Sequence, residues 1–471
     1  MSTPVYTTAD IRRIEAAAQA VEPSLMQRAG LAAANLASRL ASDRGKDILV
    51  LAGPGNNGGD ARIAARILEE RYFRVRIATA GDAAGLPSTK AWNLVVDGLF
   101  GIGLARELSG EYAALADYAN AQRCPVLALD IPSGIASDSG RMLGKAVRAT
   151  HTLTFLAHKP GLLTLEGPDH CGEVHVDDLG VDVRALVPPG GWIASPLLFR
   201  HVLKPRPRNF HKGNAGSVAV IGGAAGMCGA ALLAGRAAAR LGAGKVYVAL
   251  LDKDAPSFDA GSLEVMLRHP DDALGLDLDA WVVGPGLGEG ERAETLLGAV
   301  LTSELPCVLD ADALNLLASS ADLREACVRR AADTLLTPHP AEAARLLGIS
   351  TAAVQHDRIA AARRMRERFN AHVVLKGNGS VLVARDGHWF MNTSGNPGMA
   401  TAGMGDVLAG LLGALLCQGY SGEAALVLGT HLHGAAADAC AAGGRGPVGL
   451  TAGEVANEAR ALWNRWLCGS P

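Results

Sequence analysis

Short apolar runs alternate with Ala- and Leu-rich stretches along the whole chain of 471 residues, and this alternation constrains the fold more than any other feature. Apolar runs separated by helical stretches are typical of parallel α/β architecture. In the first part of the chain, the runs predict strands at residues 48–52, 75–79, 94–96, 126–129, 152–156 and 174–176. A second series predicts strands at residues 217–221, 246–251, 281–283, 307–309, 334–336 and 373–375.

Two further patterns predict a hairpin near the end of this series and a boundary between two domains. Residues 380–392 (SVLVARDGHWFMN) predict a hairpin whose turn is Asp386-Gly387. Residues 187–209 are rich in Pro and Arg and lack a periodic pattern, so this segment is the candidate joint between two domains. We therefore predict two α/β domains, at residues 1–205 and 206–471.

The composition excludes several classes of function. A net charge of −3 leaves no basic field to hold DNA, RNA or an anionic membrane, and 4% aromatic residues are too few for a base-stacking platform. Eight cysteines without a CxxC pair indicate reduced thiols rather than disulfides or a zinc knuckle. The N-terminus shows no apolar signal segment, and the longest apolar run, Val407 to Cys417, is too short for a membrane span. We expect a soluble, cytoplasmic protein.

A glycine-rich loop follows the first predicted strand. Residues 53–60 (GPGNNGGD) fit the pattern G-x-G-x-x-G between a strand and a helix, which aims backbone N–H groups at an anion. The acidic residue that binds ribose about 20 residues further on in standard dinucleotide sites is not clear, since the nearest candidate, Asp82, lies beyond the second strand. The alternative is an ordinary βα turn in which Asp60 caps the helix.

Polar residues also follow the neighbouring strands of the first domain. Asp97 ends one predicted strand, and Asp130 and Ser133 follow another. Loops at the carboxyl ends of parallel strands meet at one edge, so Asn57, Asp97 and Ser133 would offer hard oxygen ligands. Such a set suits an alkali or alkaline-earth cation better than zinc. The alternative is that each acid only caps its own turn.

In the second domain, the most informative segment is the glycine turn Gly403-Met404-Gly405, which precedes Asp406 and an apolar helix. The free N–H groups of such a turn would face a developing anion, and Asp406 could take a proton from a substrate hydroxyl. The alternative is an ordinary N-cap Asp. The chain contains no GxxxxGK[ST] motif, which argues against a P-loop NTPase, so nucleotide binding would need this other type of loop.

Further residues that could take part in catalysis or binding follow successive predicted strands of the second domain. They are the glycines of GPGLG (284–288), Asp310 and Asp312, His339, and Lys376 and Ser380 around a glycine turn, with His211 and Lys212 as weaker members. A lone His or Lys is usually solvated surface, but the shared placement predicts one site. Met227 and Cys228 are expected to be core packing.

These motifs together resemble a known family. The segments GPGNNGGD, GIGLARE (101–107) and DIPSG (130–134) resemble the NAD(P)H-hydrate epimerase domain. The segments GPGLG, DADALN (310–315), TPHPAE (337–342), KGNGS (376–380) and GMGD (403–406) resemble the ADP-dependent NAD(P)H-hydrate dehydratase. Their order is typical of the bacterial bifunctional repair enzymes. The resemblance implies an N-terminal Rossmann-like three-layer sandwich and a C-terminal ribokinase-like domain.

The resemblance also implies an activity. The first domain would interconvert the R and S epimers of NADHX and NADPHX, the nicotinamide cofactors hydrated at C6. The second would phosphorylate the hydroxyl of the S epimer with ADP, after which phosphate leaves and NAD(P)H, AMP and phosphate are released. Phosphate leaves carbon far more readily than hydroxide does, so a phosphorylating fold suits a net dehydration. Asp130 and Asp406 would be catalytic.

By the same motif match, potassium would bind Asn57, Asp97 and Ser133, and Mg²⁺ would bridge the phosphates. The epimerase contacts to the hydrate would be Asn56, Asn57, Gly58, Gly59, Asp60, Gly101, Ile102, Gly103, Leu104, Ala105, Arg106, Glu107 and Asp130. The dehydratase contacts to the hydrate would be Ala230, Gly286, His339 and Asp406. The adenine nucleotide would contact Lys376, Gly377, Asn378, Gly379, Ser380 and Gly405. We also expect a homo-oligomer.

Two other functions fit the same residues. A small-molecule kinase that keeps its phosphorylated product would use the same glycine turn and Asp406. The first domain could also be a non-catalytic scaffold for binding or dimerisation. A pure interaction protein fits least well, because the polar residues cluster at strand exits rather than along helical faces.

Overall fold

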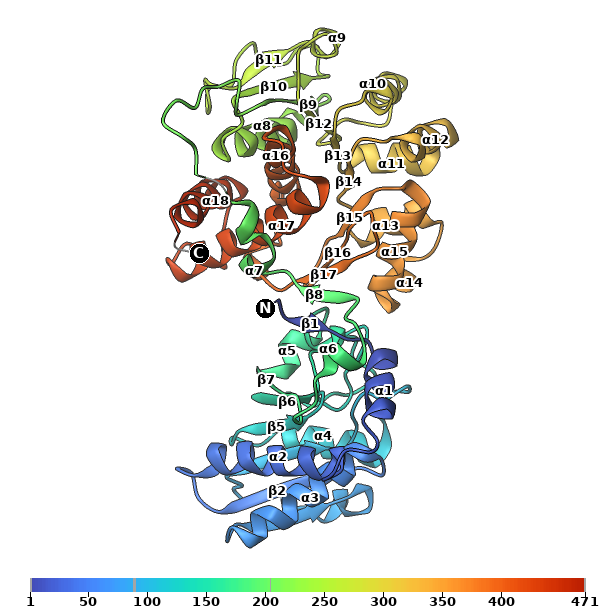
Figure 1. Cartoon of the computed structure of the whole chain (residues 1–471), viewed down its shortest axis with the longest axis vertical. Coiled ribbons are helices and arrows are strands. Elements are labelled where there is room, and N and C mark those ends of the chain that lie inside the picture. Colours follow the sequence, from blue (N-terminus) through green and yellow to red (C-terminus); the bar gives the residue numbers. More distant parts are fainter. Residues whose placement is uncertain (1, 88–89, 204, 470–471) are drawn as a thin grey trace. The chain divides into compact units, whose positions relative to one another are not determined.

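The computed structural model describes residues 2–87, 90–203 and 205–469, and these residues form two compact units (Figure 1). One unit comprises Thr3–Trp192, and the other comprises the described residues from Ile193 onward. Both units are α/β, as the alternating apolar runs predict. None of the helices in these ranges is long and apolar enough to cross a membrane.

The first unit is built on a parallel sheet whose strands lie in the order β3-β2-β4-β5-β6-β7. Its strands are β2 (Asp47–Ala52), β3 (Arg74–Ala78), β4 (Leu94–Gly98), β5 (Val126–Leu129), β6 (His151–Phe155) and β7 (Glu173–Asp177). The chain order reverses between β2 and β4, which pair directly. In open α/β sheets, the loops at such a switch point form the ligand crevice.

Helices cover both faces of this sheet. Ile48 and Val50 of β2 pack with residues of α2 and α3 in one core, whereas Leu49 and Leu51 pack with residues of α4 in another. The alternation follows from the two-residue period of a strand. The helical elements are α1 (Thr8–Ala17), α2 (Leu25–Ala41), α3 (Asn56–Glu70), η1 (Ala80–Gly85), α4 (Gly110–Asn120), η2 (Pro160–Leu162), α5 (Gly167–Cys171) and α6 (Val183–Leu186). The expected three-layer sandwich is therefore confirmed.

A short antiparallel pair joins the two ends of the first unit. Strand β1 (Pro4–Val5) pairs with β8 (Gly191–Ile193), so that Pro4 faces Trp192. The apolar runs did not predict either strand, because each is only two or three residues long.

The second unit has a mixed sheet in the order β17-β16-β15-β14-β13-β12-β9-β10-β11. Its strands are β9 (Ser217–Gly222), β10 (Lys245–Leu250), β11 (Met266–Arg268), β12 (Ala280–Val283), β13 (Cys307–Leu309), β14 (Thr334–Leu336), β15 (His372–Leu375), β16 (Ser380–Val383) and β17 (Trp389–Asn392). The strands from β15 to β11 pair in parallel, and β16 and β17 form the predicted antiparallel hairpin. Here the chain order reverses between β9 and β12.

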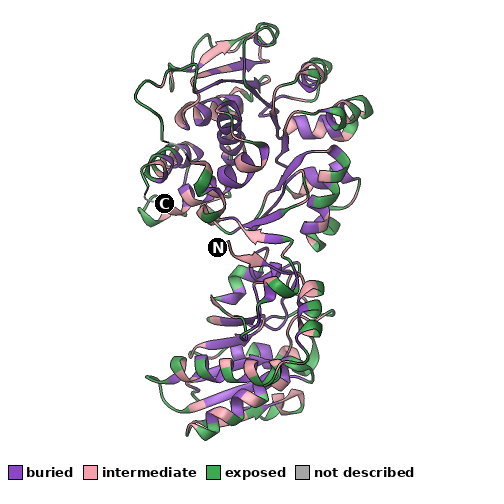
Figure 2. Cartoon of the chain, in the orientation of Figure 1, coloured by how far each residue is buried: buried purple, intermediate pink, exposed green. Residues whose placement is uncertain are grey.

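The helix α16 (Met404–Cys417) lies at the centre of the second unit and is buried along most of its length (Figure 2). It packs on α8 and on the sheet strands β9 and β12. The remaining helical elements are α7 (Pro196–Phe199), η3 (Arg200–Val202), α8 (Cys228–Arg240), α9 (Pro270–Ala273), α10 (Glu291–Thr302), α11 (Asp312–Ser319), α12 (Ala321–Arg329), α13 (Pro340–Leu347), α14 (Thr351–His356), α15 (Arg358–Phe369), η4 (Pro397–Met399), α17 (Gly422–Ala442) and α18 (Ala452–Leu467).

One of the alternatives and one expectation are wrong. Asp60 does not cap a helix, because α3 begins at Asn56 after Gly55 and Asp60 lies inside its first turns. Met227 is not core packing, because 41% of it is exposed. The cysteines among the described residues are all free, as expected, although Cys468 is exposed rather than in a core.

Candidate functional site

The switch point of the first sheet brings the loops after β2 and β4 into backbone contact. The N–H of Gly53 donates to the carbonyl of Gly98 at 3.1 Å. A Cβ at Gly53 would lie 1.7 Å from the carbonyl oxygen of Leu99, so only glycine permits this approach. The glycine-rich loop and the loop that follows Asp97 are therefore held together at this edge.

Asp97 and Ser133 form a buried hydrogen-bonded pair. The Ser133 hydroxyl donates to Asp97 Oδ1 at 2.7 Å, and the Ser133 N–H donates to Oδ2 at 2.8 Å. Burial raises the pKa of Asp97 to about 6, although the hydrogen bonds from Ser133 lower it. The main chain of Phe100 also contacts the Ser133 hydroxyl, with the N–H at 2.9 Å and the carbonyl oxygen at 3.1 Å.

Asn57 has a buried side chain whose amide oxygen and nitrogen both lack a hydrogen-bond partner. The residue is 8% exposed and stands in the first turn of α3. A Cβ at Gly98 would lie 3.0 Å from the Asn57 carbonyl oxygen, which places the start of α3 directly beside the end of β4. Buried polar groups are almost always satisfied, so an unsatisfied amide at this point indicates a place for a ligand or ion.

Three carboxyl groups and a lysine gather near the start of α3. Lys159 is fully buried, and its ammonium donates to Asp130 Oδ1 at 2.5 Å, to the Thr154 hydroxyl and to a main-chain carbonyl. Burial, together with the charges of Asp130 and Glu15, raises the pKa of Asp60 to about 8. Burial also raises the pKa of Glu15, on α1. At neutral pH, Asp60 is therefore protonated.

The loop at residues 101–107 meets this cluster only at its beginning. The N–H of Ile102 donates to Asp130 Oδ2 at 3.3 Å, and a Cβ at Gly101 would lie 2.9 Å from the same oxygen. Asn57 lies 3.5 Å from that Cβ position, so Gly101 separates the two side chains. The residues 103 and 105–107 are exposed, and they lie outside the buried cluster. Asn56 is exposed at the start of α3.

In the second unit, the switch point also brings two glycine loops together. The N–H of Ala224, after β9, donates to the carbonyl of Gly286, after β12, at 2.6 Å. Gly286 has a φ of 59°, and a Cβ there would lie 3.4 Å from the Cβ of Ala230. Gly286 and Ala230, which were predicted to contact the same ligand, are thus neighbours.

The start of α16 forms the centre of the second site. Gly403, with a φ of 89°, is the N-cap, and Asp406 stands in the first turn. A Cβ at Gly405 would lie 3.3 Å from Lys376 Nζ and 3.5 Å from Asp310 Oδ2. Burial raises the pKa of Asp406 to about 6, and Asp310 raises it while Lys376 lowers it. The free N–H groups of this turn therefore lie beside one lysine and two acids.

Lys376 is the cation of this site. Its Nζ donates to Asp310 Oδ1 at 2.8 Å and lies 4.0 Å from Glu342 Oε2. Burial alone would lower the pKa of Lys376, but Asp310, Glu342 and Asp406 outweigh it and raise the pKa. Asp310 is held by a second bond, because the Thr337 hydroxyl donates to it at 2.7 Å.

His339 caps α13 at the edge of this site. Its Nδ1 accepts from the N–H of Ala341 at 3.1 Å, so the ring proton lies on Nε2. Burial lowers the pKa of His339, and Lys376 and Arg345 lower it further. The side chain is 48% exposed, and its Nε2 lies 3.3 Å from Glu342 Oε1.

The turn at residues 377–380 is closed by its own serine. The N–H of Gly377 donates to the Ser380 hydroxyl at 3.2 Å, and that hydroxyl lies 3.0 Å from the Gly377 carbonyl. Arg358, which is buried, donates to the carbonyls of Leu375 and Lys376 at 3.1 and 3.3 Å. Burial lowers the pKa of Arg358 to about 10. These bonds fix the exit of β15 and the loop that carries Asn378 and Gly379.

Several site residues were not predicted from the sequence. Lys159 and Glu15 belong to the first site, and Glu342 and His433 to the second. His433 is buried on α17 with no partner for Nε2, and burial lowers its pKa to about 4, as does the charge of Lys376. Glu342 falls within the segment TPHPAE, so this motif could have identified Glu342 as a site residue. The other three stand in no glycine-rich segment, and only the tertiary fold brings them to the sites.

The donor sets decide which ions the two sites suit. In the first site, the unsatisfied amide of Asn57 and the buried oxygens of Asp97 and Ser133 are hard oxygen ligands, which suit an alkali or alkaline-earth cation better than zinc. In the second unit, no three His, Cys, Asp or Glu ligand atoms converge within the described ranges. A divalent ion would therefore enter together with the phosphates that it binds.

One hollow of the first unit lies apart from these residues. It has a volume of ≈ 700 Å³ and is lined by Arg44, Leu86, Lys90, Trp92, Tyr118 and Cys124, among others. None of the predicted site residues lines it, so it does not extend the candidate site.

Comparison with known proteins gives matches over nearly the whole chain. Residues 218–457 match the family described as NAD(P)H-hydrate dehydratase, and residues 22–93 and 82–161 match the family described as YjeF-related protein N-terminus. A bifunctional NAD(P)H-hydrate repair enzyme of Coxiella burnetii is 40% identical over 98% of this chain and 100% of its own length. A protein of the same name from Escherichia coli is 38% identical over 93% of this chain and 90% of its own length.

The second unit is also similar to proteins of one activity. The ADP-dependent (S)-NAD(P)H-hydrate dehydratase of Neisseria meningitidis is 47% identical over 58% of this chain and 93% of its own length. Among solved structures, an ADP/ATP-dependent NAD(P)H-hydrate dehydratase from Bacillus subtilis, co-crystallized with ATP/Mg²⁺, gives a TM-score of 0.51 at 28% identity. It covers 58% of this chain and 98% of its own chain.

Proposed function

The chain belongs to the family of bifunctional NAD(P)H-hydrate repair enzymes, and from this premise we propose how its two units divide the repair. The first unit is an isomerase that interconverts the R and S epimers of NADHX and NADPHX. The second is a lyase that dehydrates the S epimer to NAD(P)H with ADP, giving AMP and phosphate. The placement of Asp406 beside Gly405 and Lys376 at the start of α16 carries this proposal most directly.

In the first unit, Asp130 is the acid/base for epimerisation at C6. The buried ammonium of Lys159 compensates its charge, and the N–H of Ile102 orients its second oxygen. Asp60 has a pKa of about 8 and therefore remains protonated at neutral pH, so it can supply the complementary acid. The loops at 56–60 and 101–107 hold the hydrated ring between these two carboxyl groups.

Potassium is held by Asn57, Asp97 and Ser133. The amide of Asn57 is buried without a partner, and an ion at its oxygen would satisfy it. A bound cation would offset the negative charges of Asp97 and Asp130, and it would order the loop that follows β4. No zinc chemistry is needed for a proton transfer of this kind.

In the second unit, Asp406 takes the proton from the C6 hydroxyl of the S epimer. The hydroxyl oxygen then forms a bond to the β-phosphorus of ADP as the bond from that phosphorus to the bridging oxygen breaks, and AMP leaves. The N–H groups at Gly403–Gly405 and the Lys376 ammonium stabilise the transferring phosphoryl group. The C6–O bond breaks next, phosphate leaves with the electron pair, and loss of a ring proton restores NAD(P)H.

The contacts to substrates follow from the same placement. Gly286, Ala230 and His339 hold the hydrate, and the turn at 376–380 holds the adenine nucleotide. When bound, Mg²⁺ would neutralise part of the negative charge of the ADP phosphates. Asp310 is the buried acid that accepts a hydrogen bond from Lys376. Lys376 and Gly405 lie where the two ligands meet.

The remaining proposals concern the whole chain. We assign the unit Thr3–Trp192 to the epimerase and the unit that begins at Ile193 to the dehydratase, a boundary that lies before the one expected from the sequence at residues 205 and 206. We also expect a homo-oligomer in the cytoplasm. Sedimentation of the purified chain tests the oligomeric state.

One assay tests both activities. The purified chain is mixed with R,S-hydrate, ADP, Mg²⁺ and potassium, and the absorbance of the reduced nicotinamide ring is followed. Complete conversion of both epimers supports two activities. Conversion that stops when the S epimer is exhausted removes the epimerase, and a stable phosphorylated compound in place of NAD(P)H would indicate a kinase instead.

A further inference from the structure

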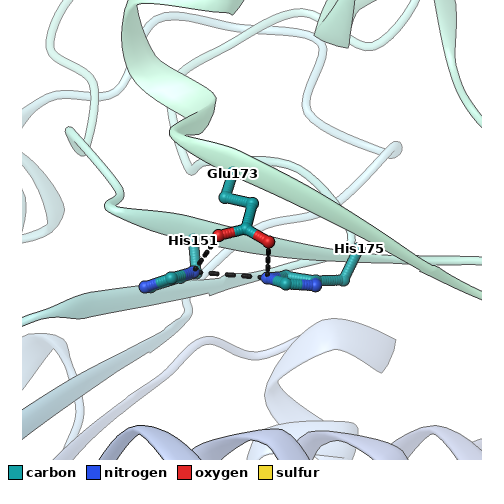
Figure 3. Close-up of side chains that lie close together, drawn as sticks. All are labelled: His151, Glu173 and His175. Atoms are coloured by element: carbon teal, nitrogen blue, oxygen red, sulfur yellow. Dashed lines mark hydrogen bonds and ion pairs between the residues drawn. The ribbon is translucent and has the colours of Figure 1, made fainter.

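Two histidines and a glutamate meet on the edge of the first sheet, away from the site described above (Figure 3). His151 begins β6, and Glu173 and His175 stand on the edge strand β7. The parallel register pairs His151 with Glu173 and Leu153 with His175. Since residues two apart on a strand share a face, all three side chains leave the same face of the sheet.

The three side chains point toward one another (Figure 3). His151 Nδ1 lies 3.2 Å from His175 Nε2. Glu173 places one oxygen 3.8 Å from His151 Nδ1 and the other 3.7 Å from His175 Nε2. Two nitrogens that bind one tetrahedral zinc ion lie about 3.3 Å apart, given Zn–N bonds of about 2.0–2.1 Å. The histidine pair therefore already has the spacing of two ligands.

We propose that His151, Glu173 and His175 bind one divalent transition-metal ion, of which Zn²⁺ fits best. Two imidazoles and a carboxylate suit Zn²⁺, Ni²⁺ or Cu²⁺, and they are poor ligands for Mg²⁺ or Ca²⁺. These three ligands leave a fourth tetrahedral position for water. The ion would fasten the edge strand β7 to β6.

The charge and exposure of Glu173 favour a bound cation. Burial and the charge of His175 lower the pKa of His151, Glu173 raises it, and Arg44 lowers it. Glu173 supplies a negative charge and is 68% exposed, which leaves it free to move closer to a bound ion. The site differs from the proposed potassium site in place as well as chemistry. Asp97 lies near the carboxyl end of β4, whereas His151 begins β6 in the same parallel sheet and so lies at the opposite edge.

The test is the binding of Zn²⁺ to the full chain, prepared without an affinity tag and free of ADP, which would itself bind the metal. Equilibrium dialysis and calorimetry should give one saturable equivalent per chain, and Zn²⁺ should raise the temperature at which the first unit unfolds. Mg²⁺ and Ca²⁺ should do neither.

Variants identify the ligands. His175→Ala and Glu173→Gln should each weaken Zn²⁺ binding by about tenfold or more. His388→Ala is the matched control, because His388 is also an exposed histidine beside a carboxylate, 2.9 Å from Asp386, and should bind Zn²⁺ as the parent chain does. Since Glu173→Gln changes an exposed side chain, it tests the site even if a histidine variant folds poorly.

Three outcomes would overturn the proposal. They are no saturable Zn²⁺ binding by the parent chain, binding that is equally tight in His175→Ala, and binding by Glu173→Gln that equals that of the parent. Equal binding in all variants would place the metal elsewhere, for example on the exposed thiol of Cys468.

Discussion

The two candidate sites occupy the same position in an α/β sheet but surround their acids with different charges. In the first unit, one fully buried lysine, Lys159, pairs with Asp130, and Asp60 lies nearby with a pKa raised to about 8 by burial. In the second, Lys376 lies between Asp310 and Glu342 beside the open turn of α16. A protonated acid next to a paired carboxylate suits proton exchange on a ring, whereas a lysine beside free N–H groups suits the transfer of a phosphoryl group.

The largest effect is expected from Asp406→Asn. Loss of the base should lower kcat of the dehydratase by about 10³-fold, since general-base catalysis contributes about 10²–10⁴-fold. Epimerisation should not change. The rates of both steps are measured separately on purified epimers, and Asp322→Asn, at an exposed position in the first turn of α12, is the control. An unchanged dehydration rate would show that another group takes the proton.

A large loss of stability is expected from Lys159→Met. The change leaves the mostly buried Asp130 carboxylate without its countercharge, which should destabilise the first unit by about 3 kcal/mol. Calorimetry of the full chain measures this loss of stability. The unfolding transition of the first unit is the one whose midpoint temperature ADP with Mg²⁺ does not raise, and the variant should lower that temperature. Lys145→Met, whose exposed pair with Asp117 should contribute less than about 1 kcal/mol, is the control. Equal shifts for both variants would show that the buried pair stabilises the first unit no more than the exposed pair does.

The pH dependence of the dehydratase sharpens the contrast between the sites. Asp406 acts as a base only when ionised, and its pKa is about 6. The rate should therefore rise with pH up to about 6 and then level off, falling about tenfold for each pH unit below that value. Single-turnover rates on the pure S epimer measure this profile, and a rate that stays constant down to pH 5 would contradict it.

The potassium ligands can be tested by Asn57→Ala. Removal of one oxygen ligand, at a cost of about 1.4 kcal/mol, should raise the potassium concentration for half-maximal epimerisation about tenfold. The dehydratase should keep its rate at every potassium concentration. The exposed neighbour Asn56 supplies the matched variant, Asn56→Ala, which should leave the potassium response as it is. If both variants respond alike, Asn57 is no ligand.

A further effect concerns the pH dependence of stability. Asp60 binds its proton in the folded chain up to about pH 8 but loses it near pH 4 when unfolded. Between these values, the folded chain holds more protons, so the stability of the first unit should fall as pH rises, by at most about 1.4 kcal/mol per pH unit. Asp60→Asn should flatten this slope, measured by calorimetry from pH 5 to 8. Asp82→Asn should not flatten it, because Asp82 is a half-buried acid whose pKa is lowered by hydrogen bonds from Thr79.

The sequence predicted the parts of both sites that lie at strand exits. Asn57, Asp97 and Ser133 could be grouped because loops after parallel strands meet at one edge. Lys159 could not, because a single lysine after a strand carries no motif, and its burial against Asp130 depends on how β5 and β6 pair. Glu15 comes from a helix far earlier in the chain, and only packing brings it near Asp60.

Other misses have local causes. The helix after the first glycine loop begins at Asn56 rather than after Asp60, because Gly55 already serves as its N-cap. The histidine pair of β6 and β7 could not be predicted without the pairing register of these two strands. Alternating polar residues in a short edge strand do not reveal that register.

The central claim is that each unit carries its own complete site, and complementation tests it most directly. Asp130→Asn should dehydrate the S epimer at the parent rate without epimerising, and Asp406→Asn should epimerise without dehydrating. A mixture of the two variants should then convert an R,S mixture to NAD(P)H as completely as the parent chain. If the mixture stops when the S epimer is used up, or if either variant loses both steps, the division of labour is wrong.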